Sequence, residues 1–122
     1  IIQDSAVFFE EQAIYDSYGG VAFDVEEGNS IAEALGDKKT VILQNHGLLT
    51  TGTNVDTAVW LFISMDKCCQ SQLLAEAAGE PTLIPDEIAL HAKAQAGSDL
   101  VLWASFQPLY DLIYKMQPDF LD

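Results

Sequence analysis

The fold is decided by residues 34–79, ALGDKKTVILQNHGLLTTGTNVDTAVWLFISMDKCCQSQLLAEAAG. Within this stretch, Thr40–Asn45 is rich in β-branched and apolar residues, which is typical of a strand that is covered on both faces. Leu48–Thr51 then resumes a strand pattern. We therefore predict two consecutive strands, with His46 at the bend between them and Gly47 allowing a sharp turn.

A long helix is predicted from Val55 to Ala78. Thr53 or Asn54 can cap its first turn, and Gly79 marks its end. One apolar stripe follows it at helical spacing: Val55, Val59, Phe62, Met65, Cys69 and Leu73. The first half of the helix is apolar nearly all round, so we expect it to be buried on more than one side, either inside one domain or at a subunit interface.

The flanking segments extend an alternation of strands and helices. Upstream, residues 1–20 are predicted to be irregular with one short helix, Val21–Phe23 to be a short strand, and Asp24–Leu35 to be a helix. Downstream, Asp86–Ala96 is predicted to be a helix, and Leu100–Tyr114 an aromatic-rich tail that is helical in part around a proline. This alternation indicates an α/β fold in which helices cover a sheet, and 122 residues are enough for one domain only.

The chain is strongly acidic. It has nineteen Asp and Glu residues but only five Lys and no Arg, which gives a formal net charge of -14. Nucleic acids and anionic membrane surfaces both recruit cationic side chains, so both are disfavoured as partners. We interpret the acidity as a solvated surface. The longest uncharged run, Thr40–Val55, is too short to span a membrane.

The two cysteines, Cys68 and Cys69, are adjacent within the predicted long helix, where the geometry for bridging each other is poor. We predict reduced thiols in a cytoplasmic protein, and no secretion signal is visible at the start of the chain. The chain opens with Ile1 rather than Met. We therefore expect it to be a cut piece of a longer protein.

Residues Ala34–Gly79 closely resemble class II aldolase/adducin domains, in which a strand runs into Asn-His-Gly, a second strand ends in Gly, and a long helix follows. The flanks YDSYGGVAF (15–23) and FQPLYDLIYKMQPDFLD (106–122) look like those of fungal members. The resemblance implies a mixed sheet flanked by helices, with residues 1–122 forming a single partial domain that lacks its amino-terminal part. It also implies a small-molecule substrate and a homo-oligomer, commonly a tetramer, or a partner chain.

By the same resemblance, His46 takes the role of the third ligand of a catalytic zinc ion. Zinc binds neutral imidazole nitrogens and acts as a Lewis acid that stabilises an enediolate. The family supplies two more ligands from an upstream His-x-His pair, and typically a Glu as general acid/base, but the 45 residues before His46 contain no His. Catalytic zinc usually needs three protein ligands, so we predict that this chain alone is an incomplete site.

The other candidate residues have plainer interpretations. His91 has no ligand partner at helical spacing, which favours an exposed helix residue. Cys68 is interpreted as helix surface rather than as a nucleophile, because no His or Lys lies at i±4 to activate it. Asp66 could support His46 from the long helix, although a solvated carboxylate is the simpler interpretation.

Three functions compete. The first is a zinc-dependent lyase that acts on a small hydroxy-carbonyl compound by aldol cleavage, decarboxylation or epimerisation. The second is a non-catalytic interaction module, as in adducins. The third is a metal-independent enzyme of fungal secondary metabolism with an apolar pocket. We predict the first for the intact protein and inactivity as an aldolase for this chain alone.

Overall fold

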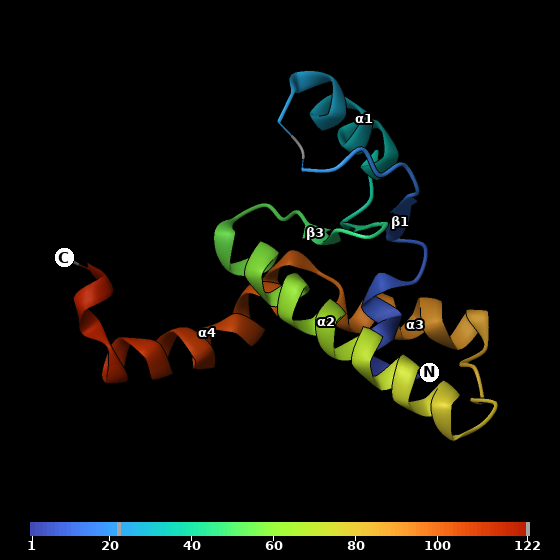
Figure 1. Ribbon diagram of the computed structural model, residues 1–122. Helices are drawn as coiled ribbons and strands as arrows, with labels where there is room; N and C mark the ends of the chain where they lie inside the picture. The colour runs from blue at the N-terminus through green and yellow to red at the C-terminus, as the bar shows by residue number, and fades with distance from the viewer. Residues whose placement is uncertain (22, 122) are drawn as a thin grey trace.

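The computed structural model describes residues 1–21 and 23–121. Its elements are the 3-10 helices η1 (Gln3–Phe8) and η2 (Pro118–Leu121), the strands β1 (Gln12–Tyr15), β2 (Thr40–Leu43) and β3 (Gly47–Thr50), and the helices α1 (Val25–Leu35), α2 (Val55–Ala78), α3 (Asp86–Ala96) and α4 (Asp99–Met116). Figure 1 shows the strands between α1 on one side and α2 with α3 on the other, while α4 carries the chain away from the body towards the C-terminus.

The three strands form one mixed sheet in the order β1-β2-β3. β1 and β2 are parallel and are joined through α1, which makes a βαβ unit. β2 and β3 are antiparallel and form a hairpin. The predicted class, an α/β fold with a mixed sheet flanked by helices, is therefore confirmed.

The two faces of the sheet meet different helices. Ile42 and Leu48 are cross-strand partners, and both pack against the main core cluster. Successive side chains of a strand point to opposite faces, so Val41 and Leu43 point to the other face, where α1 lies against β1 and β2. Val41 is fully buried and Leu43 nearly so. β2 is thus covered on both faces, as its composition predicted.

The core joins η1, α2 and α4. Its buried members are Val7, Phe8, Leu61, Met65, Cys68 and Leu102. The start of α2 is fixed by Asn54, whose Oδ1 accepts a hydrogen bond from the Thr57 backbone nitrogen at 2.8 Å. Its first turn is tied to the sheet by Thr50, whose Oγ1 donates to the Ala58 carbonyl at 2.9 Å. The hairpin therefore sits on a well-anchored helix.

The connection between η1 and β1 is clamped by lysines. Lys93 Nζ on α3 donates to the Phe9 carbonyl at 3.0 Å and pairs with a Glu11 carboxylate oxygen at 2.8 Å. Lys38 Nζ donates to the Glu10 carbonyl at 3.0 Å. Glu10 has a φ of 62°, a left-handed conformation that is uncommon for residues other than glycine. The clamps hold this unusual turn in place.

Two predictions about the amino-terminal region are wrong. Residues 1–20 contain a strand, β1, in addition to the short helix η1. The strand that we predicted at Val21–Phe23 is absent from the described part of that run, since Val21 and Phe23 lie outside any strand and are exposed, while Ala22 lies outside the described residues. A run of this length becomes a strand only where a neighbour pairs with it, and β2 pairs with Gln12–Tyr15.

The predicted apolar stripe of α2 is also wrong. Of its members only Met65 is buried, whereas Val55, Val59, Phe62 and Leu73 are exposed. The buried face is instead Thr57, Leu61, Met65 and Cys68. A helix that is apolar nearly all round gives no periodic signal that selects one face, so tertiary packing made the choice.

Candidate functional site

His46 lies in the three-residue turn between β2 and β3, at the strand end where it was predicted. Its backbone nitrogen donates to the Leu43 carbonyl at 3.0 Å, which closes the turn. Asn45 before it has a φ of 57°, and Gly47 after it has a φ of 155°. Asn and Gly are the residues that adopt such conformations most readily, so the sequence Asn-His-Gly is suited to presenting one side chain on a sharp turn.

The turn is also fixed from the neighbouring strand. The Gln44 backbone nitrogen donates to the Tyr15 carbonyl at 2.9 Å, so the carboxyl end of β1 lies against the turn. The imidazole of His46 is exposed, and among the described residues no hydrogen bond occupies either ring nitrogen. The side chain is available to an external ligand, while its backbone is held by the buried strand behind it.

His46 does not belong to a cluster of metal-ligand candidates within the part of the chain that the structure describes. Within residues 1–21 and 23–121, no group of three or more His, Cys, Asp or Glu side chains is arranged to hold a metal ion. Asp66 is exposed, and its carboxylate accepts a hydrogen bond from Gln70 Nε2 at 2.7 Å rather than one from His46. His91 is exposed on α3, as predicted. The described residues therefore contribute a single imidazole and not a complete zinc site.

The cysteines differ from our prediction. Cys68 is part of the buried core and not of the helix surface. Burial raises the pKa of its thiol to about 11, and the nearby Asp4 carboxylate adds to the increase. Burial also raises the pKa of Cys69, with a smaller contribution from Asp66. Both thiols are free and protonated near neutral pH, which agrees with the predictions that the cysteines are reduced and that Cys68 is not a nucleophile.

The molecule also has a cavity of about 530 Å³ that the sequence did not reveal. It opens between η1, the sheet and α2, and His46 is not among its lining residues. Its walls come from four separate elements, so no local sequence pattern could have predicted the cavity.

The comparisons with known proteins agree on one family. Residues 1–73 match the family model described as "Class II Aldolase and Adducin N-terminal domain". The chain is 41% identical over 119 residues to decarboxylase NovR of Streptomyces niveus, covering 98% of this chain and 44% of that protein. It is also 41% identical over 119 residues to a protein of Streptomyces roseochromogenus subsp. oscitans named 4-hydroxy-3-prenylphenylpyruvate oxygenase/4-hydroxy-3-prenylbenzoate synthase, covering 98% of this chain and 43% of that one.

A solved structure supports the same family. The L-fuculose 1-phosphate aldolase from Glaciozyma antarctica PI12 superposes with a TM-score of 0.86 at 36% identity, over 97% of this chain and 44% of that chain. The chain thus spans less than half the length of these relatives. None of the helices within the described residues combines the length and hydropathy needed to cross a membrane.

Proposed function

Because the chain belongs to the class II aldolase and adducin family, we propose that it supplies one metal ligand, His46, to a zinc-dependent lyase that acts on a small hydroxy-carbonyl compound. The observation that supports this most directly is the turn itself. A buried strand ends in Asn-His-Gly, and the imidazole is exposed with both ring nitrogens unoccupied by other described residues.

The zinc site is proposed to be completed from outside this chain. A single imidazole is well short of the three protein ligands that catalytic zinc usually has. The other ligands and the acid/base group would come from further polypeptide, or from another subunit of a homo-oligomer. Zinc in such enzymes serves as a Lewis acid. Within this chain, the proposed role of His46 is to hold the metal ion.

The printed names of two relatives, a decarboxylase and an aldolase, support a reaction class. Aldol cleavage breaks a carbon–carbon bond and leaves an enolate that needs stabilisation, and so does the loss of carbon dioxide from a carbon next to a carbonyl group. We therefore propose one of these two reactions for the intact protein, ahead of epimerisation. The chain alone is proposed to be inactive as an aldolase.

The metal content of the protein, purified from its natural source, tests this proposal. We expect about one zinc ion per subunit in the wild type, and loss of zinc with an unchanged fold in His46→Ala. His91→Ala is the matched control, since it removes an exposed imidazole that lies away from the turn and should leave the zinc content unchanged. Natural protein that holds no divalent metal would contradict the proposal.

A second candidate function is a non-catalytic interaction module. It is favoured by the adducin part of the family description and by the lack of a three-ligand group within the described residues. Metal-free natural protein that still binds a macromolecular partner would support the module over the lyase. Metal-free protein that turns over a small molecule would instead support the metal-independent enzyme.

A further inference from the structure

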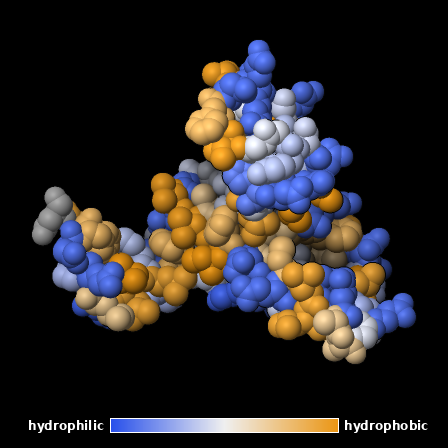
Figure 2. All heavy atoms as spheres, viewed as in Figure 1, coloured by the Kyte–Doolittle hydropathy of each residue, from blue (hydrophilic) through white to orange (hydrophobic). Residues whose placement is uncertain are grey.

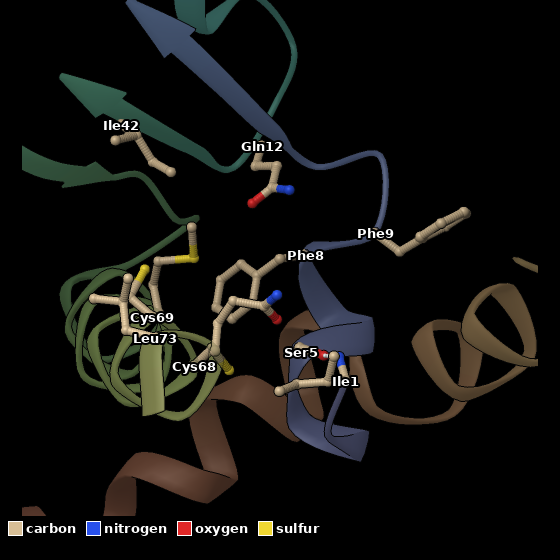
Figure 3. Close-up of a pocket in the computed structure, with 11 residues that line it drawn as sticks. Ile1, Ser5, Phe8, Phe9, Gln12, Ile42, Cys68, Cys69 and Leu73 are labelled. Atoms are coloured by element: carbon tan, nitrogen blue, oxygen red, sulfur yellow. Dashed lines mark hydrogen bonds between the residues drawn. The ribbon is translucent and has the colours of Figure 1, made fainter. Parts of the chain in front are cut away.

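The cavity of about 530 Å³ is large enough for a small organic molecule, because ligand pockets usually span about 300–1,000 Å³. Figure 3 shows η1 and β1 on one side of it and α2 on the other, with Ile42 of β2 above. It lies on the face of the sheet that packs towards α2. The β1 end of that face is incompletely covered, since Ile14 is 70% exposed.

The walls are mostly apolar. Phe8 and Met65 are buried members of the core whose side chains reach the cavity. Ile42 closes it on the side of the sheet, and Leu73, which is 67% exposed, lies at its rim. An apolar or aromatic body would therefore replace water against these four side chains, which is favourable.

Two amide side chains also face this space. Gln12 lies between Ile42 and Phe8 in Figure 3, and no hydrogen bond to another described residue engages its amide. Gln72 donates its Nε2 to Glu76, which leaves its carbonyl oxygen as an acceptor. A bound molecule could therefore make one or two directed hydrogen bonds in an otherwise apolar environment.

The lining carries no side-chain charge. Among the residues that the structure describes, no Asp, Glu, Lys or Arg side chain lines the cavity. The two thiols that do, Cys68 and Cys69, stay protonated because burial raises the pKa of each. Ile1 also lines the cavity, and its amino group donates to Ser5 Oγ at 3.2 Å. The side chains of the lining therefore offer a ligand apolar contact and uncharged hydrogen-bonding groups.

We propose that this cavity is a binding site for a small molecule with an apolar, preferably aromatic, body and one hydrogen-bonding group. The site is separate from the His46 turn, and its occupancy does not depend on the proposed lyase activity.

Indole is a suitable probe, because it is uncharged and aromatic and has one N–H donor. In an NMR titration of the full chain, we expect saturable shifts of the Gln12 side-chain amide and the Met65 methyl group. Gln12→Leu is expected to weaken indole binding about threefold to tenfold and to leave toluene binding unchanged.

A matched pair of variants locates the site. Leu73→Trp places a large ring at the cavity rim and is expected to abolish indole binding. Leu74→Trp is a control on the next residue, which is 72% exposed and does not line the cavity, and it is expected to bind like the wild type. Both positions are exposed, so both variants should fold, and their NMR spectra would verify this.

Three results would overturn the proposal. The first is no binding at millimolar indole, and the second is equal binding by the Leu73→Trp and Leu74→Trp variants. The third is indole binding that weakens as protein concentration rises, because a second copy of the chain would then be the occupant that closes the cavity.

Discussion

At the scale of single residues, Gly52 is held tightly against the first turn of α2. A Cβ at this position would lie 2.8 Å from the backbone nitrogen of Ala58 and 3.0 Å from two side-chain carbons of Thr57. We expect Gly52→Ala to lower the free energy of unfolding by about 1–3 kcal/mol, measured by chemical denaturation. Gly28→Ala is the control, because Gly28 lies inside α1 with open space around it. It is expected to raise the same free energy by about 0.5–1 kcal/mol, and a change of the same sign in both variants would contradict this account.

Cys68 makes stability depend on pH in the alkaline range. Burial raises the pKa of its thiol from 9.0 to about 11 in the folded chain. Between these values the unfolded chain loses the proton and the folded chain keeps it, so the free energy of unfolding falls as pH rises from about 9 to about 11. Below pH 9 this contribution is fully present. Cys68→Ala is expected to make the decline less steep than in the wild type, as measured by urea denaturation at several pH values. If the free energy of unfolding has the same dependence on pH in the wild type and in Cys68→Ala, folding does not raise the pKa of the Cys68 thiol.

Some features of the candidate site could be predicted from single residues of the sequence, and others could not. The position of His46 at a strand end followed from an apolar run that stops at Asn-His-Gly, which is a local signal. The burial of Cys68 was missed because α2 is apolar on several faces, and only contacts with η1 and α4 select one of them. The assignment of His46 to zinc stays a prediction, as does the resemblance of the flanks to fungal members.

At the scale of elements, the contact between α3 and the η1–β1 connection depends on Lys93. Its ammonium group bridges the Phe9 carbonyl and the Glu11 carboxylate, and both side chains of the ion pair are about one-fifth exposed. We expect Lys93→Met to lower the free energy of unfolding by about 1.5–3 kcal/mol, because a charge-assisted hydrogen bond is lost and polar partners are left behind. Lys67→Met, at an exposed position of α2, is expected to change stability by less than about 0.5 kcal/mol. If Lys93→Met and Lys67→Met are equally stable in thermal and chemical denaturation, the contacts of Lys93 with Phe9 and Glu11 do not stabilise the fold.

Elements were predictable where their ends carry signals of their own. α2 was predicted at its observed bounds because Asn54 caps it and Gly79 ends it, and α3 likewise lies between Pro85 and Gly97. β1 was missed because four residues with mixed character form a strand only when β2 lies beside them. The sequence pattern therefore indicated the fold class and the long helices but not the edge of the sheet.

At the scale of the whole molecule, apolar surface remains uncovered in the single chain. Figure 2 shows such surface along the projecting α4 and near the start of α2. Val55, Val59 and Phe62 of α2 are exposed there. Contiguous apolar surface of this kind often marks an interface, so we expect association with further copies or with a partner chain.

Sedimentation velocity over a range of concentrations measures this association. We expect species larger than the monomer for the wild type and a shift towards monomer for Phe62→Glu. Leu83→Glu is the control, because Leu83 is equally apolar and 69% exposed but lies in the loop between α2 and α3. A wild-type chain that remains monomeric at every accessible concentration, with no bound partner, would contradict the prediction.

The central claim is that this chain carries one ligand of a metal site and not the whole site. The most direct test is a calorimetric zinc titration of the 122-residue chain, wild type and His46→Ala, with retro-aldol turnover assayed in the same samples. We predict weak zinc binding that His46→Ala removes, far below the roughly 10–16 kcal/mol of complete zinc sites, and no turnover in either protein. Tight zinc binding with turnover in the wild type, both lost in His46→Ala, would contradict the claim, because the remaining ligands would then have to come from this chain or from a second copy of it.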